Sequence, residues 1–381
     1  MSEILARIRV RETHGIRRFL YPLRVELSLP GALWAAIPQM RLVSSNDLPV
    51  PSQVSENPVA SDPKRRYLDF ALSLDPFFEG TYTLQVSGQD APFDDPLQLS
   101  KHSNQGVVQS MLQSQQKRFF VSLDLFSFPK RIVYDSNAYL DDQGKQYGVQ
   151  CNGEKPRIRT YKVDDRFSGS LYRSDMKAWL NGFIRMPLIY SDGRKAWTQA
   201  DLTACKSWVT LTHCIEASSP QDEIVFTLPL AITSPTLTCD FGVGGYVFGK
   251  LDSKATEIVW HTEFGDAPYA KWTVATAGRV DYVGEVESAE AFVSQRWFHL
   301  IDSDKALAVA ITKLPESCQS MTVRLTIEGN ISIAFKPGGS PETVAVFGIC
   351  YHFLNDVPAI AAATNPQSIL LPPTVEVLPV G

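Results

Sequence analysis

The sequence predicts an all-β protein, built as a large antiparallel two-sheet β-sandwich with a few short helices. Short runs rich in Val, Ile, Phe, Tyr and Thr recur along the chain, and polar and apolar residues alternate in most of them, as a sheet with one buried face requires. The 25 prolines and 23 glycines are spread evenly and divide the chain into short segments. No long amphipathic helix and no strand–helix–strand alternation accompanies these runs, so a sandwich or barrel is indicated.

The expected strands follow one another along the whole chain, at 23–27, 81–86, 119–123, 208–213, 258–261, 322–327 and 343–351. Turn residues separate them, as at 191–193, and the Glu-Gly-Asn segment at 328–330 lies between two alternating runs, which predicts a hairpin. Short helices are expected at 107–116, 201–207 and 288–294. The proline-containing end, 370–381, predicts an extended strand or a tail along the surface.

Residues 1–381 are expected to form a single domain, with the polar stretch 88–106 as its weakest internal boundary. The apolar fraction of 44% and the charged fraction of 20% are ordinary for a globular protein. The net charge of −5 and the brevity of basic runs such as 64–66 exclude a nucleic-acid partner. No apolar stretch approaches the roughly 18–20 residues of a membrane span, so no membrane partner is expected.

The cysteines and the N-terminus predict a cytoplasmic protein. The six cysteines form no CxxC pair and are typical of scattered, buried thiols. Residues 1–10 carry charges and lack the apolar core of a signal peptide. A phosphate-binding loop, a nucleophile elbow and an HExxH zinc motif are all absent from the sequence, and no helix pattern follows the glycine-rich residues 242–245, so neither a cofactor nor a metal is expected.

Candidate catalytic residues are side chains that titrate or donate protons near strand ends or on strand faces. These are His261, His299, His352 and Tyr190. His213 shares the face of three aliphatic residues and is instead expected to be a hydrogen-bonded core residue. Candidate substrate-binding residues combine cations that neutralise a sugar carboxylate with aromatic and amide groups that stack on or hydrogen-bond a sugar ring. They are Arg173, Arg185, Trp197, Lys206, Trp297 and Asn355.

Several stretches resemble the exo-rhamnogalacturonan-lyase-like proteins. The first is 12–18 (ETHGIRR) followed by 21–25 (YPLRV). Others are 49–54 (PVPSQV), 70–84, 296–302 (RWFHLID) and 307–311 (LAVAI). The resemblance implies a galactose-mutarotase-like super-sandwich, a fold used by polysaccharide lyases, glycosidases and sugar epimerases. Multidomain lyases of this type also carry a large α-helical toroid, for which this chain has no helical segment of sufficient length.

The expected function is therefore a carbohydrate-active enzyme that acts on an oligosaccharide or polysaccharide by β-elimination at an acidic sugar. A histidine or tyrosine would remove the C5 proton and another would protonate the leaving oxygen, while an arginine or lysine would neutralise the carboxylate and stabilise the enolate-like intermediate. One alternative is a sugar epimerase or a glycoside hydrolase on the same fold. A hydrolase would need two carboxylates, for which Asp240, Glu263 and Asp356 are available. Another alternative is a non-catalytic carbohydrate-binding or structural assembly protein, including a homo-oligomer that buries its sheet edges.

Overall fold

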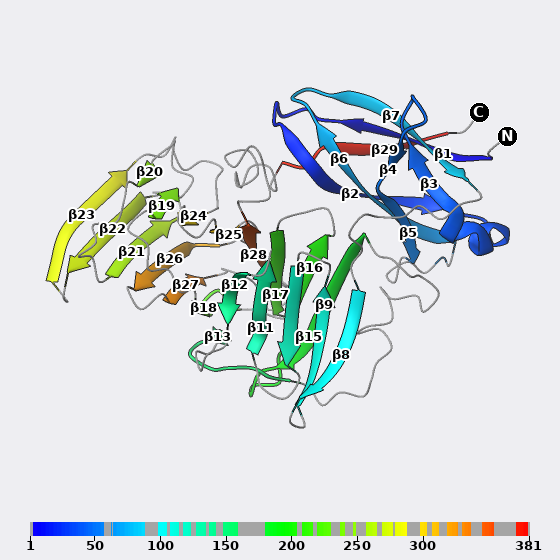
Figure 1. Cartoon of the computed structure of the whole chain (residues 1–381). Coiled ribbons are helices and arrows are strands. Elements are labelled where there is room, and N and C mark those ends of the chain that lie inside the picture. Colours follow the sequence, from blue (N-terminus) through cyan, green and yellow to red (C-terminus); the bar gives the residue numbers. More distant parts are fainter. Residues whose placement is uncertain are drawn as a thin grey trace.

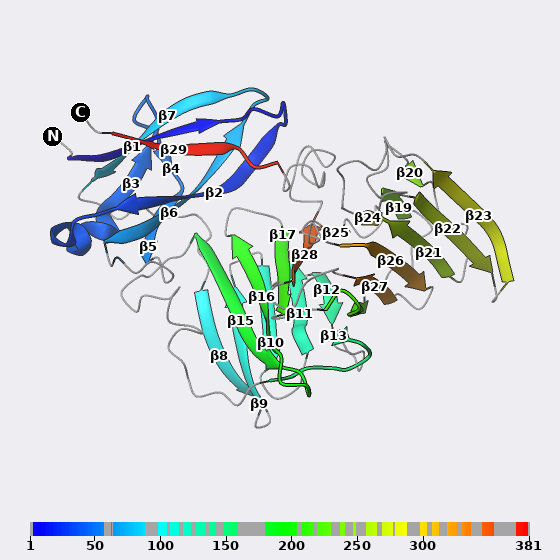
Figure 2. The same ribbon diagram turned by 180° about the vertical axis from the view of Figure 1, so that it is seen from behind.

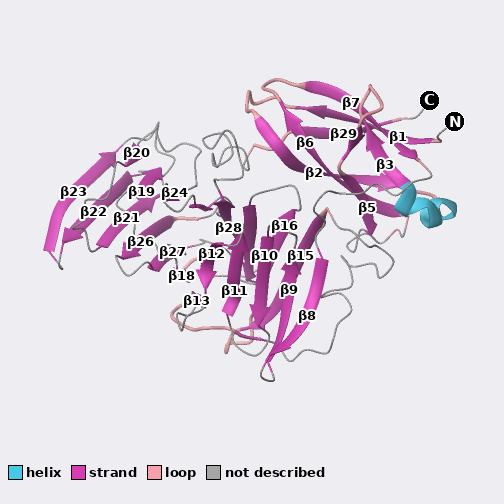
Figure 3. Cartoon of the chain, in the orientation of Figure 1, coloured by secondary structure: helices cyan, strands magenta, loops and turns pink. Residues whose placement is uncertain are grey.

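The structure is a computed structural model. It describes residues 3–56, 62, 64–87, 98–104, 107–113, 117–122, 127–134, 137–141, 148–158, 180–203, 208–215, 219–229, 237–240, 247–248, 257–264, 269–276, 279–287, 298–302, 307–311, 318–326, 330–336, 345–353 and 371–379. Throughout these residues the chain consists of antiparallel strands with one short helix (Figures 1 and 3). The predicted all-β class and sandwich architecture are confirmed, although the strands form five sheets rather than two.

Two of these sheets are built from the N-terminal part of the chain, and one of them also includes the C-terminal strand. The five-stranded sheet has the order β29-β1-β7-β3-β4, and a three-stranded sheet has the order β2-β6-β5. Their bounds are β1 (Ile4–Arg11), β2 (Arg18–Ser28), β3 (Met40–Val43), β4 (Pro49–Val50), β5 (Ser52–Glu56), β6 (Arg65–Leu74), β7 (Glu79–Val86) and β29 (Thr374–Leu378). Strands β1 and β29 are antiparallel neighbours, with Arg7 opposite Leu378 and Arg11 opposite Thr374. The predicted extended C-terminal segment is therefore an edge strand of the N-terminal sheet.

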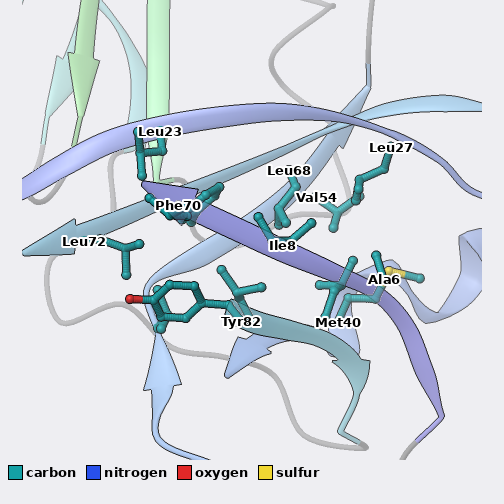
Figure 4. Close-up of a cluster of buried hydrophobic side chains, with 14 of the residues drawn as sticks. Ala6, Ile8, Leu23, Leu27, Met40, Val54, Leu68, Phe70, Leu72 and Tyr82 are labelled. Carbon is teal, nitrogen blue, oxygen red and sulfur yellow. The ribbon is translucent and has the colours of Figure 1, made fainter. Parts of the chain in front are cut away.

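These two sheets enclose a hydrophobic core of their own, which we call the N-terminal core (Figure 4). Alternate residues of β1 point into it, because the burial of Ala6, Ile8 and Val10 alternates with the exposure of their neighbours. The opposing sheet contributes Leu68 and Phe70, which are fully buried. The buried residues of the N-terminal core all lie between positions 6 and 84, and Val375 of β29 packs against them.

The remaining strands form three larger sheets. A five-stranded sheet has the order β12-β11-β10-β9-β8, a seven-stranded sheet β13-β18-β27-β26-β21-β22-β23, and a nine-stranded sheet β14-β15-β16-β17-β28-β25-β24-β19-β20. The bounds up to β18 are β8 (Gln98–Asn104), β9 (Val107–Gln113), β10 (Lys117–Ser122), β11 (Ser127–Tyr134), β12 (Asn137–Asp141), β13 (Gly148–Cys151), β14 (Arg157–Ile158), β15 (Asn181–Ile189), β16 (Lys195–Thr203), β17 (Trp208–Ile215) and β18 (Ile224–Pro229). Those of the later strands are β19 (Leu237–Asp240), β20 (Val247–Phe248), β21 (Glu257–Glu263), β22 (Tyr269–Thr276), β23 (Arg279–Glu287), β24 (Phe298–Asp302), β25 (Leu307–Ile311), β26 (Ser320–Thr326), β27 (Asn330–Lys336) and β28 (Ala345–Phe353).

These sheets are layered around buried strands. Figures 1 and 2 show β8–β11 stacked against β15–β17, and β9 contacts β15. Residues 212–215 of β17 are all buried, so this strand is covered on both faces. In the seven-stranded sheet the burial alternates, and Ile258, Trp260 and Val323 lie on its buried face.

The strand predictions are confirmed, and the helix predictions are wrong where the structure describes them. Residues 107–113 form β9, because they pair along their length with β8 and β10. Residues 201–203 belong to β16 and pair with both β15 and β17. Cross-strand partners override local helix propensity in both segments. Of the predicted helices, 114–116, 204–207 and 288–294 lie outside the described residues, as do 123, 327 and 343–344 of the predicted strands.

One helix was not predicted. The 3₁₀ helix η1 (Gly31–Gln39) begins after Pro30, which suits a helix start, and contains three alanines and Trp34. The guanidinium of Arg66 lies 4.4 Å from the centre of the Trp34 ring, and the Trp34 indole donates to the carbonyl of Leu29 over 3.4 Å. These contacts hold η1 against the end of the N-terminal core.

Three further expectations concern the chain as a whole. Cys151, Cys214 and Cys318 are buried free thiols, as the sequence predicts for scattered cysteines. No helix in the described part of the chain is long and apolar enough to cross a membrane. The expectation of one domain over 1–381 stays a prediction. Of its proposed weak boundary, 88–97 and 105–106 lie outside the described residues, and 98–104 form β8.

Candidate functional site

The candidate site is built around His261 in β21, on the exposed face of the seven-stranded sheet. Burial alternates along β21, so His261 and Glu263 face solvent while their neighbours are buried. The Nε2 atom of His261 lies 2.8 Å from Oε1 of Glu263, and its Nδ1 atom lies 2.8 Å from Oγ1 of Thr322 in β26. The side chains of His261 and Glu263 are 32% and 36% exposed, so both are accessible.

The chemistry of the partners determines the direction of these hydrogen bonds. A carboxylate only accepts, so Nε2 of neutral His261 carries the proton and donates it to Glu263. Nδ1 then has the free lone pair and accepts from the Thr322 hydroxyl. A histidine whose N–H is held by a carboxylate is oriented as a general base, and its charged form is stabilised after it takes a proton.

The neighbouring strand adds a cation and an aromatic ring. Register places Lys271 of β22 directly opposite His261, and Lys271 is exposed. Opposite residues on one face of an antiparallel pair have Cβ atoms about 5 Å apart. The rings of Tyr269 and His261 have centroids 5.9 Å apart and planes inclined by 53°. A base, a cation and an aromatic ring are therefore neighbours on one open face.

Glu257 marks the far end of the same strand face. Its carboxylate accepts from Nη1 of Arg324 over 2.7 Å. Six residues separate Glu257 from Glu263, which corresponds to about 20 Å along a strand. That separation is too large for the two carboxylates of a glycoside hydrolase, which flank one glycosidic bond at roughly 5–9.5 Å.

The other predicted histidines lie in a different sheet. His299 in β24 and His352 in β28 both belong to the nine-stranded sheet, on either side of β25. Register places His299 opposite Asp240 and Ala310, and His352 opposite Trp208 and Ala308. The structure therefore brings Asp240, a predicted hydrolase carboxylate, beside His299, and it does not bring either position into the sheet of His261.

Tyr190 lies in the core rather than on a surface. It is 1% exposed, and its hydroxyl lies 3.4 Å from Nε2 of His213, whose Nδ1 lies 2.8 Å from the hydroxyl of Thr198. His213 is completely buried, which lowers its pKa to about 3 and keeps it neutral. Burial, together with the Cys151 thiol, raises the pKa of Tyr190. The prediction for His213 is confirmed, and within the described residues the Tyr190 hydroxyl is buried against His213.

A second polar cluster ties three turns together. Arg194 donates to Asp192 and to Asp222, both over 2.5 Å, and its Nη2 lies 3.5 Å from Sγ of Cys151. Asp222 also accepts from the side chain of Asn152 over 2.8 Å and from the backbone of Ser219 over 2.7 Å. Burial alone would raise the pKa of Asp222, but these donors hold it below its usual value. Burial, reinforced by Asp222, raises the pKa of Cys151 to about 11, so this thiol is unreactive.

Of the predicted substrate-binding residues, the structure describes two. Trp197 in β16 is half-buried and pairs by register with Cys214. Arg185 belongs to β15 and pairs with Gln199 of β16. The other predicted substrate-binding residues, together with the hydrolase candidate Asp356, lie outside the described residues: Arg173, Lys206, Trp297 and Asn355. The assignments of these residues to a site stay predictions.

Sequence reasoning missed three members of the His261 group, Tyr269, Thr322 and Lys271. The alternation of Glu257, Val259, His261 and Glu263 shows that the histidine and the carboxylate share a face. Thr322 and Lys271 come from strands 61 residues later and 10 residues later in the chain. Only the register between strands brings them to His261, and register is set by long-range pairing.

Comparisons with known proteins complete the description. No protein-family model matches the chain, and no curated protein matches it. Among solved structures, a glycosyl hydrolase family 38 protein from Enterococcus faecalis is 10% identical, with a TM-score of 0.43, over 98% of this chain and 47% of that one. An alpha-mannosidase from the same organism is 9% identical, with a TM-score of 0.43, over 98% of this chain and 46% of that one. A provisionally assigned aldose 1-epimerase from Klebsiella pneumoniae is 10% identical, with a TM-score of 0.39, over 73% of this chain and 89% of that one. The chain spans about half the length of the first two, and at these TM-scores the likenesses carry no argument.

Proposed function

We propose that the chain is a carbohydrate-active enzyme that uses His261 as a general base on an acidic sugar. The single observation that carries the proposal is the accessible imidazole held at both nitrogens, by Glu263 and by Thr322, each over 2.8 Å. Such a base contributes about 10²–10⁴ to the rate of a proton transfer. The surrounding groups then favour one class of proton transfer over others.

Lys271 supports β-elimination. Abstraction of a proton next to a carboxylate places negative charge on that carboxylate, and a cation beside it stabilises the charge. Lys271 stands one strand away from the base and is exposed. In this proposal the Thr322 hydroxyl turns away from Nδ1 of His261, and Nδ1 then removes the proton at the carbon that bears the carboxylate. A carbon–carbon double bond forms as the adjacent C–O bond to the leaving sugar breaks, and the leaving oxygen takes a proton from water. Lys271 neutralises the carboxylate, and Tyr269 packs beside the sugar ring.

Two other reaction classes receive less support from the same face. The separation of Glu257 and Glu263 does not suit glycoside hydrolysis. Thr322, His261 and Glu263 also form a hydroxyl–imidazole–carboxylate chain, as in acyl transfer. Acyl transfer needs unpaired backbone N–H groups to bind the oxyanion, and Thr322 instead lies within a ladder between β21 and β27. These observations favour proton transfer over glycoside hydrolysis and acyl transfer on this face.

The test is an activity assay on a panel of acidic and neutral oligosaccharides, followed by the ultraviolet absorbance of unsaturated uronates and by release of reducing sugar. We expect a rise in absorbance with an acidic member, and a loss of about hundredfold or more in kcat/KM for His261→Asn. The matched control is His14→Asn, since His14 is exposed in the N-terminal sandwich. Reducing sugar without a rise in absorbance would indicate hydrolysis, and equal activity of the two variants would remove His261 from the mechanism.

A further inference from the structure

The exposed face of the N-terminal five-stranded sheet carries four arginines, which we call the arginine strip: Arg7, Arg9, Arg11 and Arg41. The first three alternate along β1 with the buried residues Ala6, Ile8 and Val10, so they point away from the N-terminal core. Arg41 in β3 pairs with Gln85, which in turn pairs with Ile4 of β1, so it belongs to the same face. Alternate residues of a strand are about 7 Å apart, so the strip presents regularly spaced cations.

The positive charge of this face is only partly compensated. Two carboxylates lie on it: Glu376 accepts from Arg11 and lies 3.8 Å from Arg9, and Glu79 lies 3.7 Å from Arg9. Within the described residues, neither Arg7 nor Arg41 has a carboxylate within ion-pair distance. Buried Nε atoms of Arg11 and Arg41 also lack a hydrogen-bond partner there. Four arginines and two glutamates leave an excess of two positive charges on a chain whose net charge is −5.

Most of the groups between the arginines are hydrogen-bonding side chains, and the apolar Leu378 lies opposite Arg7. Register places Thr83 opposite Arg7, Thr81 opposite Arg9 and Thr374 opposite Arg11, with Gln85 in the row of Arg41. Threonine hydroxyls and the glutamine amide both donate and accept, as the hydroxyl groups of a sugar do. The described positions of this face include no aromatic residue on which a nucleobase could stack. Carboxylates interspersed with hydroxyl groups match this face better than a nucleic acid does.

We propose that the arginine strip binds the carboxylates of an acidic polysaccharide chain and is distinct from the His261 site. The charge of the face argues for a polyanion. The choice of a polysaccharide rests on the hydroxyl-rich rows and on the proposed function, whereas anion binding rests on the strip alone. The strip would hold the polymer while its acidic sugar units are presented to a catalytic site elsewhere on the chain.

The experiment measures binding of polygalacturonate to the full chain by biolayer interferometry, in the His261→Asn background so that turnover does not remove the polymer. We expect the R7Q/R41Q variant to bind about tenfold more weakly at low salt, as the loss of two ion pairs with the polymer predicts. R7K/R41K retains most of the affinity, because both side chains keep their charge. The matched control is R17Q, since Arg17 is exposed and lies outside the strip, 3.4 Å from Asp75. Binding falls steeply in about 0.5 M salt.

Three outcomes would overturn the inference. Equal binding by R7Q/R41Q and R17Q would remove the strip from the interaction, and so would failure of the parent protein to bind polygalacturonate. Tighter binding of a single-stranded oligonucleotide or of anionic lipid vesicles than of polygalacturonate would replace the polysaccharide by another polyanion. Because binding is measured without turnover, a failure of the catalytic proposal is seen separately, as equal activity of His261→Asn and the parent protein.

Discussion

Two buried titratable residues, Glu12 and His213, make the free energy of unfolding depend on pH, each over a different pH range. His213 is fully buried and neutral, whereas Glu12 is buried and ionised, because it accepts from Arg18 and from the backbone of His14 over 2.6 Å. Burial alone would raise the pKa of Glu12, but the hydrogen bond from Arg18 and those from the backbone hold it below its usual value of 4.5. Each residue therefore favours the folded state only in the protonation state that its surroundings accept.

His213 is expected to weaken the fold as the pH falls below about 6.5. Its pKa is about 3 in the folded chain against 6.5 in the unfolded chain, so only the unfolded chain binds a proton between these values. The free energy of unfolding then decreases by about 1.4 kcal/mol per pH unit from this residue. Urea titrations from pH 7 to pH 4 would show a shallower dependence for His213→Asn. The control His14→Asn keeps the slope of the parent, and identical slopes for all three proteins would contradict the burial of His213.

The Glu12–Arg18 pair is expected to be costly to break. Both side chains are fully buried, and Arg18 also donates to the carbonyl of Leu371 and stacks on Tyr21 at 4.6 Å. Glu12→Gln leaves the buried guanidinium without its counterion, which costs about 3 kcal/mol or more in the free energy of unfolding. Glu79→Gln is the matched control, since Glu79 is 61% exposed and its loss costs less than about 1 kcal/mol. The two variants are compared by urea unfolding at pH 7. Equal decreases in the free energy of unfolding would contradict the burial of Glu12. The extra stability of the parent over Glu12→Gln is lost as the pH falls below 4.5.

At the scale of elements, turns were predicted where glycine, asparagine or aspartate marks a backbone conformation that other residues rarely adopt. Gly193 has a φ of +87° in the β15–β16 hairpin, and the Ser-Asp-Gly signal of 191–193 predicted this turn. The hairpin between β26 and β27 was likewise predicted from its Glu-Gly-Asn segment, and Leu325 pairs with Ile331 across it. Such turns are local, so the sequence carries their full signal.

Pairing between distant strands was not predictable in the same way. Residues 107–116 lack helix breakers and were expected to be helical, yet their described part pairs with two strands. The same limit applies to the candidate site. His261 and Glu263 are two residues apart and were both singled out, whereas Thr322 reaches His261 only through the β21–β26 ladder. A single sequence shows which face a residue takes within its strand but not which strand lies beside it.

The turn at Gly193 provides a test of the β15–β16 hairpin. Gly193→Ala is expected to lower the free energy of unfolding by about 1–2 kcal/mol, because an L-residue is strained at this φ. The added Cβ meets no atom within 4 Å, so the cost is conformational rather than steric. Gly31→Ala is the control, since its Cβ meets only ordinary van der Waals contact and its φ is not positive. Equal effects of the two substitutions, measured by thermal unfolding, would contradict the turn geometry.

At the scale of the whole molecule, the N-terminal sandwich is completed by the C-terminal strand. β29 packs Val375 against the N-terminal core, and Glu376 accepts from Arg11. Leu371 supplies the carbonyl that accepts from Arg18. Strand β5 is also tied to the residue that precedes β15, because Gln53 accepts from the backbone N–H of Leu180 over 2.5 Å. The N-terminal sheets therefore depend on residues from two later parts of the chain.

Removal of residues 371–381 is expected to destabilise the N-terminal sandwich selectively. The truncation exposes the edge of β1, removes Val375 from the core and takes an acceptor from Arg18. Amide hydrogen exchange followed by mass spectrometry would show loss of protection in β1 and β7, while β21 and β26 keep theirs. Glu376→Gln in the full chain is the control, with protection close to that of the parent. Unchanged protection of β1 in the truncated chain would mean that β29 is dispensable.

The pairing of β1 with β29 also has a consequence during synthesis. Strands β2 to β28 are all made between these two neighbours. At about 5–20 residues per second, β1 has to wait roughly 20–70 s for its partner to leave the ribosome. During that time β1 is an open edge that other nascent chains could pair with. The charged side chains of Arg7, Arg9 and Arg11 repel a second copy of the same strand, and so oppose aggregation through this edge until β29 is made.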